Sequence, residues 1–306
     1  MAEKVLILGS GPAGLSAAIY TAREGFGPLV IAGADSGSQL LMTTTVENMP
    51  GFPDGVQGYE IVDLMKKQAE KFGARFVDES ASGVDFKSRP FKVFAADKTY
   101  EAESVIIATG SGYRMLGIES EAEYMGKGVS SCATCDAAFF KGKDVVVVGG
   151  GDTAMEDAYF LTRFTRSVTV VHRRDAFRAS KIMQDRVLAS PKIRVVWNSA
   201  VDEIRGDTKR VTSVVLKNLV TNEKAELPMD GVFIAIGQVP KSKIFQGQLD
   251  IDDQGYIVAT EEVKTSVEGV FVAGDVADRT YKQASVASGD GVKAALQARK
   301  YLMEKA

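Results

Sequence analysis

Both cysteines of the 306-residue chain, Cys132 and Cys135, lie in the segment SSCATCDAAF, and Asp136 follows them directly. Two cysteines placed at random in a chain of this length would have this spacing about once in 150 cases, so the pair needs a chemical explanation. A vicinal dithiol can alternate between thiols and a disulfide, and a neighbouring carboxyl group can donate or accept a thiol proton. We therefore expect Cys132 and Cys135 to form a redox pair with Asp136 as its acid/base.

Two other interpretations of the pair remain open: two inert buried thiols, or half of a zinc site completed by a second subunit. The chain has one histidine and no further cysteine, so it lacks four zinc ligands of these types, and we expect no metal. Ser130 or Ser131 can cap a short helix that begins near Cys132. The N-terminus of such a helix would stabilise a thiolate.

Two glycine-rich segments each follow an apolar run and precede an expected helix. GSGPAG (9–14) follows VLIL, and a helix over about 13–23 and a strand over 29–32 are expected after it. GGGDTA (149–154) follows VVVV, before a helix over 155–163 and a strand over 167–171. Such glycines let the backbone approach a pyrophosphate at a helix N-terminus. Two such βαβ units predict two nucleotide-binding domains. Their candidate binding residues are Gly9, Ser10, Gly11, Pro12, Ala13 and Gly14 in the first, and Gly149, Gly151, Asp152, Thr153 and Ala154 in the second.

The second βαβ unit ends its second strand with His172, Arg173 and Arg174, and Arg178 follows. An acidic residue normally binds the ribose hydroxyls at this position. Guanidinium groups match a 2′-phosphate in charge and in bidentate geometry, so we expect NADPH rather than NADH. We interpret His172, the only histidine, as part of the adenosine-phosphate pocket rather than as a catalytic base.

The first βαβ unit ends its second strand with Ala32-Gly33-Ala34-Asp35, which has no acid at the expected position. Its nucleotide must be held by several segments, as a larger cofactor would be, and Asp275 in GVFVAGD supplies one plausible carboxylate. A hydride from NADPH does not pass to a disulfide in one simple step, whereas a flavin accepts hydride and passes electrons to sulfur. We therefore expect FAD in the first domain and NADPH in the second.

Composition excludes some classes of partner. The net charge is −3, which gives no electrostatic reason to expect nucleic acid or an anionic membrane. No apolar run approaches the roughly 18 residues of a membrane span, and the N-terminus leads directly into a strand pattern. We expect a cytoplasmic protein, and in that reducing compartment a disulfide is more often catalytic than structural. Further strands are expected at 105–108, 232–236 and 270–273, and a last helix at about 291–301.

The ordered set of motifs resembles the low-molecular-weight, NADPH-dependent thioredoxin reductases of bacteria, archaea and plants over the whole chain. The motifs are GSGPAG, the segment 37–53, ATG (108–110), CATCD, GGGDTA, HRRDAFR, AIG (235–237), GVFVAGD and YKQA (281–284). The resemblance implies an α/β fold of two Rossmann-like nucleotide-binding domains of the three-layer ββα type. The NADPH domain, 114–242, would be inserted into a discontinuous FAD domain, 1–113 and 243–306. Family members are homodimers in which one domain rotates against the other.

The resemblance also implies an activity and roles for residues. Electrons would pass from NADPH through FAD and the dithiol to the disulfide of thioredoxin or a thioredoxin-like protein. Cys135 would lie nearest the flavin, Cys132 would exchange with the protein substrate, and Asp136 would be the acid/base. Arg173, Arg174 and Arg178 would hold the 2′-phosphate. The remaining FAD-binding residues would be Gln39, Asn48, Thr109, Gly110, Gly274, Asp275, Lys282, Gln283 and Ala284.

Four positions, Ser38, Ala137, Gln238 and Lys282, depart from the commonest family pattern, and so does the C-terminal segment SGDGVKAAL (288–296). None removes a chemical group that the mechanism needs. Other functions remain as alternatives: the flavoprotein of a peroxiredoxin system, a ferredoxin-fed or NADPH-independent relative, and a non-catalytic flavoprotein that senses redox state or binds a partner. The first prefers NADH, which the arginines at 173, 174 and 178 disfavour.

Overall fold

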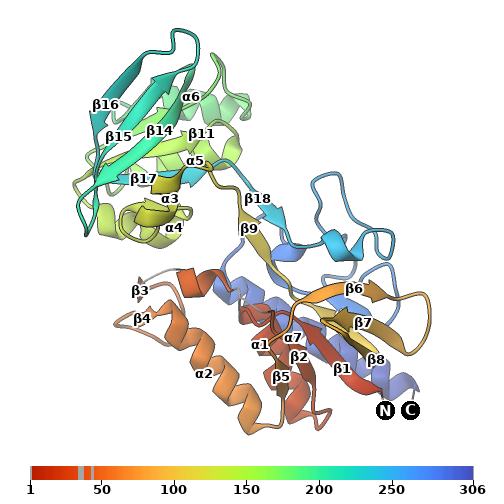
Figure 1. Ribbon diagram of the computed structural model, residues 1–306. Coiled ribbons are helices and arrows are strands. Elements are labelled where there is room, and N and C mark those ends of the chain that lie inside the picture. The colour runs from red at the N-terminus through yellow and green to blue at the C-terminus, as the bar shows by residue number, and fades with distance from the viewer. Residues whose placement is uncertain (1, 34–37, 43–44, 306) are drawn as a thin grey trace. The chain divides into compact units, whose positions relative to one another are not determined.

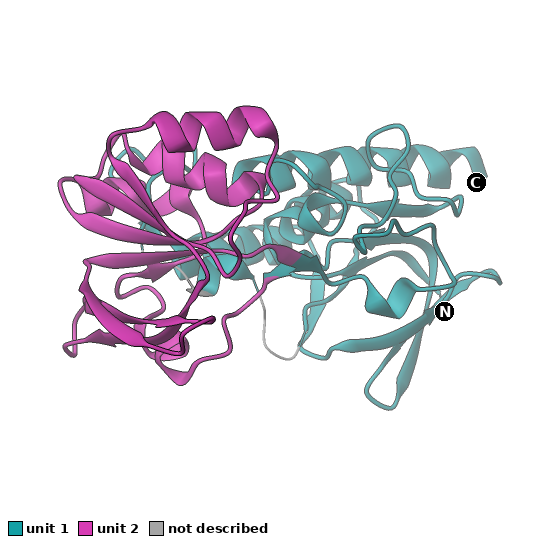
Figure 2. Cartoon of the chain, turned by 90° about the horizontal axis from the view of Figure 1, so that it is seen from above, with its two compact units in different colours: residues 1–112, 239–306 teal, residues 113–238 magenta. Residues whose placement is uncertain are grey.

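The computed structural model describes residues 2–33, 38–42 and 45–305. The chain divides into two compact units, residues 1–112 with 239–306, and residues 113–238 (Figure 2). The second unit is therefore an insertion in the first. At the two crossing points, β9 (Ser111–Tyr113) and β18 (Gln238–Pro240) pair as a two-stranded sheet. The boundaries expected from the sequence differ by one residue at the first crossing and by four at the second; which nucleotide each unit binds stays a prediction.

The first unit is built on a seven-stranded sheet in the order β5-β2-β1-β8-β7-β6, with β19 also paired to β8. β8 changes partners along its length: Lys98–Ala102 pairs antiparallel with β7, and Val105–Ile107 pairs parallel with β19. The strands are β1 (Glu3–Leu8), β2 (Leu29–Ile31), β5 (Arg75–Val77), β6 (Ala81–Asp85), β7 (Phe91–Ala95), β8 (Lys98–Ile107) and β19 (Val270–Val272).

Helices α1 (Pro12–Arg23) and α7 (Ala284–Lys305) lie side by side in the first unit (Figure 1). Small residues allow this close approach: a Cβ added to Gly291 of α7 would lie 2.0 Å from the carbonyl oxygen of Ala13. Pro12 occupies the first helical turn of α1, where its missing N–H leaves no bond unmade. The other elements of this unit are α2 (Gly58–Lys71), β3 (Thr45–Val46), β4 (Val56–Gln57) and the 3₁₀ turns Gln39–Met42, Lys243–Phe245 and Gly274–Val276.

The second unit has a five-stranded parallel sheet in the order β10-β17-β11-β12-β13 and a separate antiparallel sheet, β14-β15-β16. The strands are β10 (Val129–Ser130), β11 (Asp144–Gly149), β12 (Ser167–Val171), β13 (Ile193–Val196), β14 (Ser199–Gly206), β15 (Val211–Asn218), β16 (Lys224–Pro228) and β17 (Gly231–Ala235). The helices are α3 (Glu119–Tyr124), α4 (Ala133–Asp136), α5 (Asp152–Leu161) and α6 (Lys181–Ala189), with a 3₁₀ turn at Ala137–Phe140.

The continuous apolar runs of the sequence are central strands buried on both faces. In β11, Val145 and Val147 pack with α5 and α6, whereas Val146 and Val148 pack against the β14-β15 layer. In β1, alternate residues likewise enter two separate cores. A strand covered on both faces has no reason to alternate apolar with polar residues. The expected α/β class with layered helices and sheets is confirmed.

The expected last helix was too short, because α7 begins at Ala284 and not near residue 291. Gly289 and Gly291 weaken the helical pattern of the sequence. In the structure Gly291 is required by the contact with Ala13, which no local pattern reveals.

Candidate active site

Cys132 and Cys135 form a disulfide at the start of the short helix α4, with their Cα atoms 5.3 Å apart. Both residues are half-buried. The expected serine cap is wrong: Cys132 itself is the N-cap residue, and no side chain caps the helix. Ser130 is two residues upstream, at the end of β10, and its Oγ accepts a hydrogen bond from the Cys132 N–H at 3.1 Å. This hydrogen bond therefore helps to hold the backbone between β10 and Cys132 in place.

Asp136 ends α4, and its N–H donates to the carbonyl oxygen of Cys132 at 3.2 Å. Burial raises the pKa of the Asp136 carboxyl, and a hydrogen bond with the Ser130 side chain partly opposes this shift. Asp136 thus keeps its proton to a higher pH than an exposed aspartate does. A carboxyl group of this kind is suited to protonate a departing thiolate.

Helix α4 is anchored to the core of the second unit by small and aromatic side chains. Ala133 and Ala137 are buried beside Met155 of α5, and Phe140 packs edge-on against Phe233 of β17 with ring centroids 5.0 Å apart. The dithiol therefore belongs to the same unit as the second glycine loop. Among the described residues, no group of three or more His, Cys, Asp or Glu side chains is arranged to hold a metal ion.

The two glycine-rich loops share one geometry. A Cβ at Gly9 would lie 2.2 Å from the oxygen of Ala108, and one at Gly149 would lie 2.4 Å from the oxygen of Ala235. By contrast, Gly11 and Gly151 are the N-cap residues of α1 and α5. A Cβ at Gly151 would meet nothing within 4 Å, and one at Gly11 would meet only Ser38 Oγ, at an ordinary contact distance of 3.8 Å. A pyrophosphate can therefore reach the backbone at each helix N-terminus, so both loops fit the dinucleotides that the sequence predicts.

The first loop is completed by close packing of its other members. A Cβ at Gly14 would lie 2.0 Å from the oxygen of Gly9, and Ser10 Oγ donates to the Ala32 oxygen at 3.2 Å. Pro12 and Ala13 form the first turn of α1. Ala34 and Asp35, at the end of the second strand expected for this module, lie outside the described residues, as do Gly37, Thr43 and Thr44 of the segment 37–53.

Residues far apart in sequence meet in the first unit around Ser111. Gln39 Nε2 donates to the backbone oxygen of Ser111 at 2.9 Å, and Ser111 Oγ donates to Asp275 Oδ2 at 3.4 Å. Asn48 Nδ2 donates to Gln283 Oε1 at 3.3 Å, just before α7 begins at Ala284. The structure thus brings together residues that the family resemblance named for FAD. Ser111 was missed, because a lone serine carries no sequence pattern.

Asp275 is the titratable member of this group. Burial and the nearby Asp278 raise its pKa to about 6, while Lys282 and the Ser111 hydroxyl oppose the shift. Gly274 and Gly110 have positive φ angles of 73° and 69°, which favour glycine. Lys282 also has a positive φ, 50°, and its N–H donates to Asp278 at 2.7 Å. Thr109 Oγ1 donates to the Lys241 oxygen at 2.8 Å.

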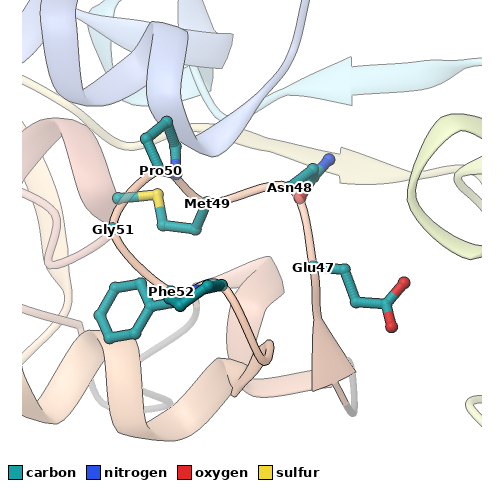
Figure 3. A pocket seen from close by; sticks show the side chains of 7 residues that line it. Glu47, Asn48, Met49, Pro50, Gly51 and Phe52 are labelled. Atoms are coloured by element: carbon teal, nitrogen blue, oxygen red, sulfur yellow. The ribbon is translucent and has the colours of Figure 1, made fainter.

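A pocket of about 470 Å³ opens beside this group, within the loop that joins β3 to β4 (Figure 3). Met49 and Phe52 point to one side of the loop and Glu47 to the other. Met49 Sδ lies 3.5 Å from Ser285 Oγ of α7, so the loop contacts the same helix start as Asn48 does. The lining residues are Glu47, Asn48, Met49, Pro50, Gly51, Phe52 and Pro53.

The second glycine loop is held beside the arginine-bearing segment. The Arg178 N–H donates to the Gly150 oxygen at 2.8 Å. Asp152 Oδ1 accepts hydrogen bonds from the Ser180 N–H at 2.9 Å and from Ser180 Oγ at 2.7 Å, and these bonds lower the Asp152 pKa. Thr153 and Ala154 follow in the first turn of α5. Arg173, Arg174 and Arg178 are exposed, and within the described ranges none of their guanidinium groups forms an ion pair.

His172 lies beneath the second glycine loop and not among the exposed arginines. It is buried, and a Cβ at Gly150 would lie 2.2 Å from its ring. Its Nε2 is 3.1 Å from the Ala176 oxygen. The imidazole therefore contacts the loop from inside.

Two nucleotide-binding loops and a redox-capable disulfide define a nucleotide-dependent disulfide oxidoreductase. Residues 3–291 match the family model for pyridine nucleotide-disulphide oxidoreductases. A thioredoxin reductase of Rickettsia typhi is 52% identical over 98% of this chain and 98% of its own. The solved thioredoxin reductases of Giardia duodenalis and Streptococcus pyogenes superpose with a TM-score of 0.94 each, at 43% and 40% identity, covering 98% of both chains. The chain belongs to the pyridine nucleotide-disulphide oxidoreductase family and, within it, to the thioredoxin reductases.

In the described part of the chain, every helix is too short or too polar to cross a bilayer.

Proposed function

We propose that this chain is an NADPH-dependent thioredoxin reductase in which Cys132 and Cys135 carry electrons from FAD to the disulfide of thioredoxin or a thioredoxin-like protein. The observation that carries the proposal is the Cys132–Cys135 disulfide, which lies half-buried next to a carboxyl group of raised pKa. The dithiol shares its unit with a glycine loop flanked by exposed arginines.

The cofactors are divided between the two units. The first unit would hold FAD through the loop 9–14, the residues around Ser111 and Asp275, and the start of α7. The second would hold NADPH through the loop 149–154, with Arg173, Arg174 and Arg178 on the 2′-phosphate. Bound FAD supplies the chemistry that the protein lacks, since it accepts a hydride from NADPH and delivers two electrons to a disulfide.

The thiol chemistry then follows from the residues of α4. Two electrons and two protons convert the Cys132–Cys135 disulfide into two thiols. The Cys132 thiolate attacks the partner's disulfide, forms a mixed disulfide and releases one partner thiolate, which takes a proton. The Cys135 thiolate attacks Cys132 Sγ, restores the internal disulfide and releases the second partner sulfur. Asp136, whose pKa burial raises, holds the proton for a departing thiolate.

The proposal includes a homodimer in the cytoplasm, without a nucleic-acid or membrane partner. Large apolar side chains are exposed on the first unit: Tyr59 and Leu64 on α2 are 56% and 51% exposed. Single exposed apolar residues are common, but two on one helix of 14 residues support an interface between subunits. Light scattering should give a dimer mass for the wild type and a monomer mass for Leu64→Glu, and a monomeric wild type would contradict this part.

Converting Cys132 to Ser tests the main proposal. The variant should keep anaerobic bleaching of the flavin by NADPH but lose thioredoxin reduction, because it has no sulfur to exchange with the partner. Ser131→Ala, in the same segment, is the matched control and should retain both. Full thioredoxin reduction by Cys132→Ser would exclude the proposed mechanism. Replacing NADPH with NADH should reduce the rate at least about tenfold if the arginines read the 2′-phosphate.

A further inference from the structure

We propose that His172 is a positioning residue that fixes the spacing between the two halves of the candidate NADPH site, the glycine loop (149–152) and the arginine loop (172–180). This inference rests on the proposed function, because it assigns how the second unit recognises a nucleotide with two separated phosphates. It specifies how His172, interpreted from the sequence as part of the adenosine-phosphate pocket, would act there.

The two loops begin side by side at the same edge of the sheet. β11 and β12 are parallel neighbours, and Val148 pairs with Val171 just before each loop starts. The arginine loop then runs nine residues to α6 without helix or strand. Strand pairing therefore sets where the loops start but not how far apart their later residues lie. That spacing needs direct contacts between the loops.

The buried His172 ring provides such a contact on the interior side of the two loops. It lies against the backbone of Gly150, where even a methyl group would be only 2.2 Å from the ring. Its Nε2 is 3.1 Å from the Ala176 oxygen in the arginine loop, and the ring also interacts with the backbone of Gly149. One imidazole thus touches both loops.

Aromatic side chains prevent the ring from moving away. The rings of Phe177 and Trp197 lie 5.6 and 6.1 Å from the His172 ring, and they pack on each other at 4.3 Å. His172 is 5% exposed, so no 2′-phosphate at the surface could use it as a direct ligand without displacing this packing. Burial, with Arg178 and Arg174 nearby, lowers the pKa of His172, while hydrogen bonds to the Gly149 and Ala176 backbone partly oppose the shift.

Two further hydrogen bonds join the same loops: the Arg178 N–H donates to the Gly150 oxygen, and Ser180 Oγ donates to Asp152 Oδ1. The backbone of the glycine loop, which would bind the pyrophosphate, is thereby held at a set distance from the arginine that would bind the 2′-phosphate. A nucleotide that uses both loops benefits from this spacing, whereas a ligand of one loop does not.

The experiment compares His172→Leu with His172→Gln by calorimetric titration of the FAD-loaded enzyme. Leucine has a similar size but no polar contact, whereas the glutamine amide can replace Nε2 as a donor to Ala176. The probes are 2′,5′-ADP, which needs both loops, and 2′-AMP and 5′-ADP, which each need one. For the leucine variant we expect about tenfold weaker binding of 2′,5′-ADP and less than about threefold for the other two, with most of the loss restored by glutamine.

A second readout is the fluorescence of Trp197, the only tryptophan of the chain, which lies against the His172 and Phe177 rings. Its response to 2′,5′-ADP should be reduced in the leucine variant and restored by glutamine. Ser180→Ala, which removes another contact between the loops, should show the same preference for weakening 2′,5′-ADP. If the leucine variant does not fold, the glutamine and Ser180 variants still test the proposal, through their binding of the same three probes.

Equal weakening of 2′-AMP and 2′,5′-ADP would overturn the proposal in favour of a direct phosphate ligand, and unchanged binding in all variants would overturn it outright. The activity of the wild type, measured as thioredoxin reduction with NADPH, distinguishes a failure of this inference from a failure of the proposed function. If it does not reduce thioredoxin with NADPH, the function fails whatever His172 does. If it does, the variants test His172 alone.

Discussion

Ser130 links the dithiol to Asp136, its proposed acid/base. Its hydroxyl accepts a hydrogen bond from the Cys132 N–H and also bonds to the Asp136 carboxyl, so one side chain orients both reacting parts of α4. Burial outweighs this hydrogen bond, so the pKa of the Asp136 carboxyl lies above the ordinary value of an aspartate. The disulfide and the Asp136 carboxyl are therefore positioned by a neighbour on the same short segment.

Asp136→Asn should lower the rate of thioredoxin reduction by about 100-fold, because general acid catalysis of thiolate departure is lost. Flavin reduction by NADPH should change little, since it involves no thiol. Stopped-flow absorbance would separate the two steps. Asp253→Asn, at an exposed aspartate of the first unit, is the control. Equal slowing of both steps would show that Asp136 acts on structure and not on the proton.

The site residues that are easiest to propose from the sequence are those whose types and spacing alone suggest a reaction. Cys132, Cys135 and Asp136 needed no structure to be noticed. Ser130 was considered only as a cap, since its bond to Asp136 depends on the turn of α4. The place of His172 in the adenosine-phosphate pocket stays a prediction, and the sequence did not reveal that its ring is buried.

At the scale of elements, the arginine loop lies beside the N-terminus of α5, and both offer positive charge to a phosphate. Replacing Arg173 and Arg178 together with alanine should raise the KM for NADPH by about 100-fold and leave the KM for NADH nearly unchanged. Steady-state kinetics with both nucleotides would measure this. The control is Arg166→Ala, whose guanidinium pairs with Asp144 at the start of β11. Equal losses for both nucleotides would contradict selective recognition of the 2′-phosphate.

Helix α5 also holds an unfavourable charge. Burial, with Glu156 adjacent, raises the pKa of Asp157 to about 7. A folded-state pKa above the unfolded value means that the protonated group adds stability at acidic pH, and that this stability is lost as pH rises through about 7. Asp157→Asn should therefore raise the melting temperature of the second unit by a few degrees at pH 8 and much less at pH 5.

Thermal unfolding followed by Trp197 emission would test this, because that tryptophan lies in the second unit. Asp175→Asn, at an exposed position, should show no such pH-dependent gain. A gain of the same size at both pH values would indicate that the substitution acts through packing rather than charge.

Strands were predictable from the sequence where both faces of the strand are buried. The runs VLIL and VVVV correspond to β1 and β11, which are covered on both faces, and the strand Ser167–Val171 has the expected bounds. Helix starts were less predictable. α5 begins at Asp152 and α7 at Ala284, three and about seven residues before the expected starts. In α7, Gly289 and Gly291 weaken the local helical pattern, although Gly291 packs against Ala13 of α1.

At the scale of the whole molecule, one chain holds two nucleotide-loop units, one inserted in the other. Two fingerprints about 140 residues apart indicated two units. The crossing points were harder to place, since β9 and β18 are only three residues each and lack the apolar runs of the central strands. The first unit also contains the last part of the chain, because β19 pairs with β8 and α7 packs on α1.

This arrangement predicts that each nucleotide stabilises its own unit. Ligand bound to the native state slows local opening of the backbone that it contacts, so hydrogen exchange reports where it binds. Adding FAD to the FAD-depleted protein should slow exchange in residues 9–14, around Ser111 and at the start of α7. Adding 2′,5′-ADP to the FAD-loaded enzyme should instead slow exchange in residues 149–154 and 172–180. In the variant with both Arg173 and Arg178 replaced by alanine, the protection by 2′,5′-ADP should be lost and the protection by FAD should remain. Protection of 149–154 by FAD, or of 9–14 by 2′,5′-ADP, would reverse the assignment of cofactors to units.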